Sequence, residues 1–228
     1  MKKKKKKVKH RIKLIPVLIL LLIISIISIV VFLLQNIKIQ NIYIHGNVNL
    51  SDEYIINYLG LQDYPSYLSK VSLILENKLE SNPYIKDATV KSKFFAVLDI
   101  TINEEKVLFY KNYDNKYVLG SLKEVDVIPY EFINTPKVIN YIPDTVYDMF
   151  INRFQRLDIT VIDKISEIKF DPTDYDEERF LFYMVDGNYV YVTTTKLESI
   201  NYYNDIYPTL EGKKGTIYLD SGNHFQPF

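Results

Sequence analysis

The chain has 228 residues, a formal net charge of zero and no cysteine, which excludes a disulfide framework and a cysteine nucleophile. Residues 1–13 hold nine of the 28 Lys and Arg residues and no Asp or Glu, so the remainder carries 19 basic against 28 acidic residues, a net charge of −9. An acidic bulk argues against nucleic-acid binding.

The stretch from Leu14 to Leu34 is an apolar run of 21 residues without a charge. As a helix it would span roughly 32 Å, which matches the roughly 30 Å hydrocarbon core of a bilayer. The lysine-rich residues 1–13 come just before it, and the positive-inside rule keeps such a segment in the cytoplasm. We therefore predict a basic cytoplasmic tail (1–13), a transmembrane helix (14–34) and single-pass type II topology. A cleaved signal peptide is the alternative, disfavoured by the length of the run and the lack of a small-x-small cleavage site.

The pattern after the apolar run predicts a compact α+β unit over residues 35–111. Residues 37–44 alternate as in a strand, and Ser51 is placed to cap a helix that Gly60 ends. A second helix is expected from apolar residues at helical spacing, and a hairpin from residues 85–90 and 98–102. The residues of that second helix are Leu68, Val71, Leu75 and Leu79. The predicted order is β-α-α-β-β.

The polar residues 112–115 are expected to separate this unit from a mostly antiparallel β-domain with two helices, residues 112–228. Asp186-Gly187-Asn188 between two apolar runs predicts a hairpin turn. The two helices are predicted at 146–157 and 196–206. The strands are predicted at 117–120, 125–128, 137–141, 166–170, 180–185, 189–194 and 216–219.

Three groups of short motifs, in this order, make the chain resemble the FtsQ/DivIB family of bacterial cell-division proteins. The first lies in the unit 35–111: residues 42–47 (Ile-Tyr-Ile-His-Gly-Asn), 82–90 (Asn-Pro-Tyr-Ile-Lys-Asp-Ala-Thr-Val) and 100–104 (Ile-Thr-Ile-Asn-Glu). The second is Asp186-Gly187 followed by a strand and residues 196–203, and the third is residues 215–222 with Phe225 and Pro227. Phe95 and Tyr218 depart from the family, which usually has Pro and Asp there.

The resemblance implies that residues 35–111 form a POTRA-type domain and that the chain is a divisome component expected at the division septum. It also implies partners. These are bitopic coiled-coil proteins of the FtsB/DivIC and FtsL types and, through them, the septal peptidoglycan synthases. It implies a non-enzymatic role in placing and regulating septal wall synthesis.

The candidate binding surface lies near the C-terminus. The predicted strand 216–219 has no predicted strand after it, so we expect it to form a sheet edge, whose free N–H and C=O groups an incoming strand can pair with. With the resemblance, this makes Thr216, Ile217, Tyr218 and Leu219 candidate partner-binding residues. Tyr202, Tyr203 and Phe225 are candidates for the rim, and the alternative is that these aromatic residues close the core.

No catalytic, cofactor or metal site is predicted. The histidines His10, His45 and His224 lack a second ligand at metal spacing, and no nucleophile motif is present. Glu104 and Glu105 are adjacent in a predicted strand and should point to opposite faces. The acidic loop lacks the Gly and terminal Glu of a Ca²⁺-binding loop; its carboxylates are Asp171, Asp174, Asp176, Glu177 and Glu178.

Two other classes of function stay open: a POTRA-type extracytoplasmic chaperone or transport module, and a wall-processing hydrolase. The hydrolase is disfavoured because no nucleophile or metal ligand set is found. Loss of the coiled-coil partner on deletion of residues 215–228 would separate the scaffold from the chaperone.

Overall fold

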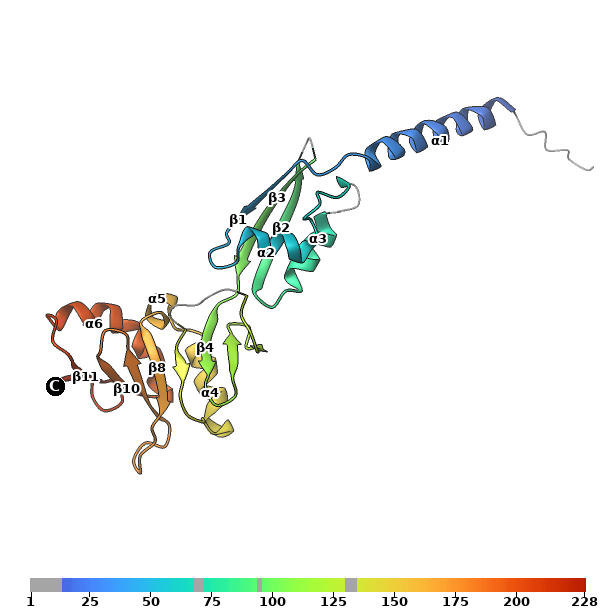
Figure 1. The fold of residues 1–228 in the computed structure, drawn as a ribbon. Helices are drawn as coiled ribbons and strands as arrows, with labels where there is room; N and C mark the ends of the chain where they lie inside the picture. The colour runs from blue at the N-terminus through green and yellow to red at the C-terminus, as the bar shows by residue number, and fades with distance from the viewer. Residues whose placement is uncertain (1–13, 68–71, 94–95, 130–134) are drawn as a thin grey trace, which may run out of the picture.

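The structure is a computed structural model, and it describes residues 14–67, 72–93, 96–129 and 135–228. Figure 1 shows three parts in sequence: a long N-terminal helix, a small α+β unit and a larger sheet with helices. The basic tail 1–13, Leu68, Val71 and Phe95 lie outside the described residues.

The N-terminal helix α1 (Leu14–Gln35) confirms the apolar helix expected at 14–34. The segment Ile15–Leu33 is long and apolar enough to cross a membrane, and none of it is buried inside the molecule. It is therefore a candidate membrane span.

The following unit has the predicted order β-α-α-β-β. It consists of β1 (Asn41–His45), α2 (Asp52–Leu59), α3 (Ser72–Glu80), β2 (Ile85–Lys93) and β3 (Val97–Glu104). The sheet order is β1-β3-β2, with β1 parallel and β2 antiparallel to β3. Ser51 caps α2 by accepting a hydrogen bond from the Tyr54 N–H, and Gly60 ends the helix at φ 70°, as the sequence predicted.

The second unit is a nine-stranded sheet in the order β12-β11-β10-β9-β8-β7-β4-β5-β6. Its strands are β4 (Val107–Lys111), β5 (Lys116–Leu119), β6 (Glu124–Val125), β7 (Lys137–Val138), β8 (Ile165–Phe170), β9 (Arg179–Met184), β10 (Tyr189–Thr193), β11 (Gly215–Tyr218) and β12 (His224–Pro227). Most neighbouring pairs are antiparallel, and β11 runs parallel to β10. Because β4 already belongs to this sheet, the change of sheet falls at residues 105–106 and not at 112, where it was expected.

The helices of this second unit are α4 (Asp144–Phe154), α5 (Ile159–Ile162), the 3₁₀ helix η2 (Thr194–Tyr202) and α6 (Tyr203–Thr209). The helix expected at 196–206 is thus divided into η2 and α6, and α5 is an addition. Stacked rings hold α4 to the sheet, with 4.6 Å between the ring centroids of Phe150 and Phe180. Each unit has its own cluster of buried apolar residues.

Candidate partner-binding surface

The strand β11 is not the sheet edge that the sequence predicted. A further strand, β12, pairs antiparallel to it, with Thr216 opposite Gln226 and Ile217 opposite Phe225. Among the described residues no strand pairs with the outer side of β12. The free edge of the sheet is therefore β12, and residues 216–219 lie one strand inside it.

The backbone of β12 presents few free groups on its outer side. The Phe228 N–H donates to the Lys214 carbonyl at 3.0 Å, so residue 228 points its hydrogen-bonding groups inward. Since these directions alternate along an antiparallel strand, Phe225 and Pro227 point theirs outward. Proline has no N–H and is typical of edge strands, which leaves the Phe225 N–H as the outward donor between His224 and Pro227.

The seven candidate side chains differ strongly in exposure. Ile217, Leu219 and Tyr203 are buried in the core, with 2%, 6% and 2% of their surface exposed. The expectation that Tyr203 lies on the rim is therefore corrected, because its ring closes the core below α6. Tyr202 is 64% exposed, and Tyr218 and Phe225 are half-buried. Thr216 is 8% exposed.

A buried hydrogen-bond network holds β11 in place. The Tyr203 hydroxyl donates to Asp186 Oδ2 at 2.6 Å and accepts from Asn188 Nδ2 at 3.2 Å. The Asn188 Oδ1 accepts in turn from the Gly215 N–H at 3.0 Å. Burial, and then the hydrogen bond to Asp186, raise the pKa of Tyr203 well above its ordinary value. The hydroxyl therefore stays protonated and joins the β9–β10 turn to α6 and the start of β11.

On the open face of the sheet, aromatic side chains form a ladder across three strands. The Tyr191 and Tyr218 rings stack with centroids 5.5 Å apart, and Tyr218 stacks on His224 at 4.6 Å. The Arg179 guanidinium lies 4.4 Å from the Tyr191 ring centroid, a favourable cation–π distance. No sequence pattern singles out Tyr191 or Arg179, because strand register decides which side chains lie next to them on the sheet.

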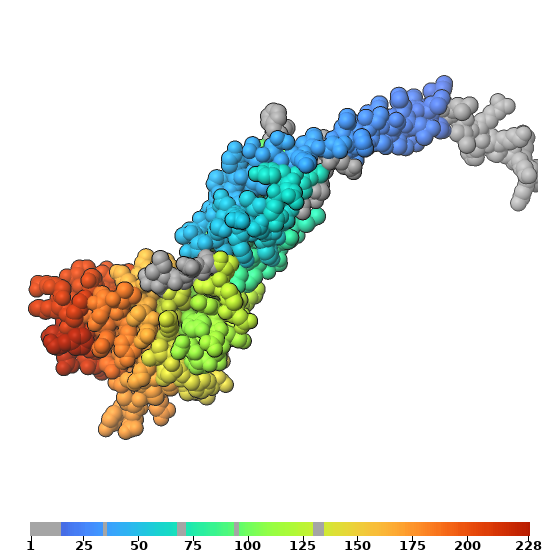
Figure 2. Space-filling model, viewed as in Figure 1, coloured from blue at the N-terminus to red at the C-terminus, as the bar shows by residue number. Residues whose placement is uncertain are grey.

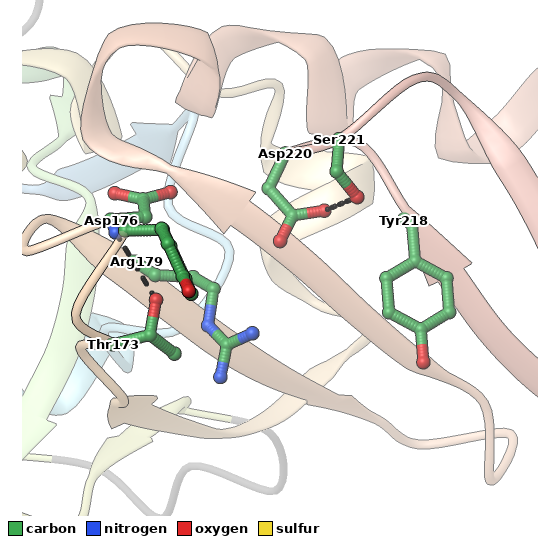
Figure 3. A pocket seen from close by; sticks show the side chains of 7 residues that line it. Thr173, Asp176, Arg179, Tyr218, Asp220 and Ser221 are labelled. Carbon is green, nitrogen blue, oxygen red and sulfur yellow. Dashed lines mark hydrogen bonds between the residues drawn. The ribbon is translucent and has the colours of Figure 1, made fainter.

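A hollow of about 450 Å³ opens beside Tyr218 of this ladder. Figure 3 shows the side chains that line it. Arg179 and Tyr218 line it together with two short segments of loop; the other lining residues are Thr173, Tyr175, Asp176, Asp220 and Ser221. Ser221 donates to Asp220 at 3.0 Å, and the Asp176 N–H donates to Thr173 at 3.1 Å. The hollow is open to solvent and is lined by charged, hydroxyl and aromatic side chains.

The acidic loop is held by ion pairs. Asp171 accepts from Lys169 Nζ at 2.9 Å and from Arg179 Nη2 at 2.8 Å. Within the described residues no group of three or more His, Cys, Asp or Glu side chains is placed to hold a metal ion. His45 lies 3.4 Å from Asp99 in an exposed ion pair, and His224 is part of β12.

Glu104 and Glu105 make separate sets of hydrogen bonds. The Glu104 carboxylate accepts hydrogen bonds from the N–H groups of Val48, Asn49 and Leu50 at 2.7 to 3.0 Å. Glu105 accepts from the adjacent Lys106 N–H at 3.0 Å. Glu104 therefore clamps the loop between β1 and α2, and the two carboxylates do not form an acid/base pair.

The small α+β unit matches a family model described as "POTRA domain, FtsQ-type" over residues 37–105. Together with the apolar N-terminal helix and the nine-stranded sheet, this defines a POTRA protein with a candidate membrane anchor. The chain is 29% identical over 99% of its length to the cell division protein DivIB of Listeria monocytogenes, covering 84% of that protein. It is also 29% identical to DivIB of Bacillus anthracis, over 97% of this chain and 84% of that protein.

The small unit is thus an FtsQ-type POTRA domain, and the chain is similar to DivIB cell-division proteins over most of its length. A solved structure of the major extracytoplasmic domain of DivIB from Geobacillus stearothermophilus matches 48% of this chain and 96% of that chain. Its sequence identity is 20% and its TM-score is 0.37.

Proposed function

We propose that the chain is a non-enzymatic scaffold of the divisome that binds FtsB/DivIC-like and FtsL-like coiled-coil proteins outside the membrane. Through them it helps to position and regulate the septal peptidoglycan synthases. In this proposal α1 is a single-pass type II anchor, which holds both folded units on the extracytoplasmic side.

The observation that carries this proposal is the free outer edge of β12. A partner segment that adds an antiparallel or parallel strand there gains the Phe225 N–H and C=O as hydrogen-bond partners. The half-buried Phe225 ring and the ladder residue Tyr218 flank this edge and supply apolar contact area. The proposed partner surface thus keeps Tyr218, Phe225 and Thr216 near the edge. Ile217, Leu219 and Tyr203 are buried in the core and support this edge without contacting the partner.

A pair of variants at one position tests the strand addition. Phe225→Pro removes both the ring and the outward N–H, whereas Phe225→Ala removes the ring alone. We expect Phe225→Ala to weaken partner capture moderately and Phe225→Pro to reduce it by a further tenfold or so, as loss of a buried hydrogen bond of about 1.5 kcal/mol implies. Equal affinities of the two variants for the co-expressed coiled-coil partners would refute pairing at this edge.

The cellular part of the proposal is tested by a fluorescent fusion to the N-terminus in dividing cells. A band at midcell that disappears on deletion of residues 215–228 is the expected result. A uniform peripheral signal at all stages would contradict a septal scaffold and favour the alternative, a POTRA-type chaperone or transport module.

A further inference from the structure

We propose that the end of the POTRA domain nearest to α1 rests on the lipid surface, through an apolar patch formed by Ile37, Tyr64, Leu73 and Ile74. The proposal concerns how the domain sits on the membrane and not which protein it binds. It rests on α1 spanning the membrane, as in the proposed function.

The patch is exposed although it is strongly apolar. Leu73 and Ile74 are 64% and 62% exposed, and Tyr64 and Ile37 are 45% and 42% exposed. In α3 the buried side chains are Leu75 and Leu79, so the apolar residues of its first turn have no partner among the described residues in the domain core. Isolated exposed apolar residues are ordinary, but a group at one end of a domain indicates an interaction surface.

Backbone hydrogen bonds bring the parts of this end together. Residues 37–39 lie against residues 65–67: the Tyr67 N–H donates to the Ile37 carbonyl at 2.8 Å, and the Ile39 N–H donates to the Pro65 carbonyl at 3.1 Å. The Tyr67 hydroxyl donates to the Lys93 carbonyl at 3.2 Å, which joins the end of β2 to the same region.

The first turn of α3 lies at this end as well. The Ser72 hydroxyl is 2.6 Å from the Ser92 hydroxyl near the end of β2. Figure 1 shows α1 leaving the domain at the end where α3 begins. In the space-filling view of Figure 2, α1 continues directly from this end of the domain.

The length of the connection sets how far the patch can be from the bilayer. The candidate span ends at Leu33, α1 continues to Gln35, and Ile37 is already hydrogen-bonded to the domain. Two helical and two extended residues reach about 10 Å. The headgroup region on each side of the core is roughly 5–8 Å thick. Ile37 therefore lies within or against the headgroups, and the other patch residues contact them when this end of the domain faces the bilayer.

The charges at this end suit a lipid surface. Lys38, Lys91 and Lys93 are exposed there, although the chain after residue 13 is acidic overall. Of the nearby carboxylates, Asp99 is paired with Lys93 and His45, Glu76 accepts from the Val90 N–H, and Asp63 is exposed. Apolar and aromatic side chains flanked by lysines are typical of segments that lie in the membrane interface.

The absence of tryptophan from the chain allows a direct test. The full chain is reconstituted into vesicles of phosphatidylglycerol and phosphatidylcholine, with bromine on the lipid chains near the headgroups. Leu73→Trp is the reporter, Leu22→Trp in α1 is the membrane control, and Tyr175→Trp, at a fully exposed site of the second unit, is the aqueous control.

We expect the bromolipids to quench Leu73→Trp and Leu22→Trp and to leave Tyr175→Trp unchanged. Adding Ile74→Glu to the Leu73→Trp reporter should abolish its quenching, with circular dichroism showing that the domain stays folded. Quenching of Leu22→Trp without quenching of Leu73→Trp overturns the docking proposal and leaves the anchor intact. Quenching of neither reporter would show that α1 does not span the membrane, which would overturn the anchor in the proposed function.

Two further measurements show what covers the patch and which interactions hold it there. If the Leu73→Trp signal depends on the protein-to-lipid ratio, a second copy of the chain covers the patch, and the lipid proposal is overturned. If quenching is retained in pure phosphatidylcholine and in high salt, the apolar side chains hold the domain. Its loss under those conditions would show that the lysines and anionic headgroups do so. Either result supports contact with lipid.

Discussion

At the scale of single residues, the short motifs that resemble the family have physical roles in the loop between β1 and α2. Gly46 has φ 84°, and a Cβ there would lie 2.2 Å from the Ile102 carbonyl oxygen, so only glycine fits. The Asn47 amide donates to the Leu50 carbonyl at 2.9 Å. Glu104 clamps the same loop from β3. Motif residues that are far apart in the sequence therefore stabilise one local structure.

The Glu104 clamp gives a first prediction. Glu104→Ala removes the acceptor of three backbone N–H groups, and such charge-assisted bonds contribute roughly 1.5–3 kcal/mol each without being additive. We expect a loss of about 2–3 kcal/mol of unfolding free energy for the POTRA domain, and about half of that for Glu104→Gln, which keeps one oxygen. Urea unfolding of the full chain in detergent measures it. Glu105→Gln is the matched control, and a loss of stability there as large as in Glu104→Ala would contradict the clamp.

The ion pairs of Asp171 give a pH-dependent prediction. Burial alone would raise its pKa, but the hydrogen bonds and charges of Lys169 and Arg179 outweigh burial and hold it below 3.8. A carboxylate with a lowered folded-state pKa stabilises the fold above its unfolded pKa, and this stabilisation is lost as the pH falls through the folded value.

We therefore expect Asp171→Asn to lower stability by about 1 kcal/mol at neutral pH, with the difference from the parent chain closing below pH 3.8. Melting temperatures measured from pH 2.5 to 7 test this. The neighbouring variant Asp174→Asn is the control, and its stability at neutral pH should equal that of the parent chain. A difference that stays constant across the range would mean that the ion pairs do not stabilise the fold.

At the scale of elements, the sequence predicts where strands lie along the chain better than which strands lie side by side in the sheet. The apolar runs 180–185 and 189–194, with the turn residues Asp186-Gly187 between them, are a local signal, and β9 and β10 lie where this signal predicts them. The strand β12 contains four residues, one of them proline, and shows no alternation strong enough to predict a strand. Its pairing with β11 is long-range, so the edge of the sheet could not be assigned from the sequence.

The second and third motif groups position β11. Asp186 and Tyr203 belong to the network that ends at the Gly215 N–H, and Lys196 Nζ donates to the Asp220 carbonyl at 2.8 Å. These residues therefore hold the two ends of β11. Among the candidate partner-binding residues, Tyr202 is exposed and Tyr218 and Phe225 are half-buried, so in the proposed function these are the side chains that a partner can contact.

The packing of β12 on Gly215 gives a prediction at this scale. A Cβ at Gly215 would lie 2.3 Å from the Gln226 carbonyl oxygen and 2.6 Å from the Phe225 ring, distances that force β12 to move. Gly215→Ala should therefore release β12 and raise the hydrogen-exchange rates of the Gln226 and Phe228 amides. The amides of β10 should keep their protection. Ser221→Ala, in the exposed turn before β12, is the control. Unchanged protection of Phe228 in Gly215→Ala would show that β12 is not held through this contact.

At the scale of the whole molecule, the sequence predicted two units in the correct order but placed the boundary six residues late. Residues 107–111 follow β3 after the polar residues Glu104, Glu105 and Lys106, but a short polar stretch of this kind does not show that the chain enters another sheet. The change of sheet at Glu105 and Lys106 depends on which strand each segment pairs with. Similarly, the β-α-α-β-β order follows from local periodicity and the N-terminal helix from its apolar composition, whereas the orientation of the units depends on contacts between distant residues.

Within the part of the chain that the structure describes, a side-chain hydrogen bond joins the two units. The Tyr84 hydroxyl, next to the start of β2, donates to the Val127 carbonyl just after β6. The Glu105 N–H donates to the Tyr84 carbonyl at 2.9 Å at the change of sheet. Burial and the nearby Tyr54 and Asp126 raise the pKa of Tyr84, so its hydroxyl remains a donor at neutral pH. The bond limits rotation about the connection at residues 105–106.

Tyr84→Phe removes this bond and keeps the ring, so we expect it to widen the range of angles between the units with little effect on the stability of either. The natural absence of cysteine allows spin labels at Asp63→Cys and Tyr175→Cys, one in each unit, without background. The distance distribution between them should broaden in Tyr84→Phe. It should stay unchanged in Tyr110→Phe, whose hydroxyl bonds to Asn115 within the second unit. If the distribution is as narrow in Tyr84→Phe as in the parent chain, the packing at residues 105–106 alone sets the orientation. A broadened distribution would show that the Tyr84 hydroxyl restricts the angle between the two units.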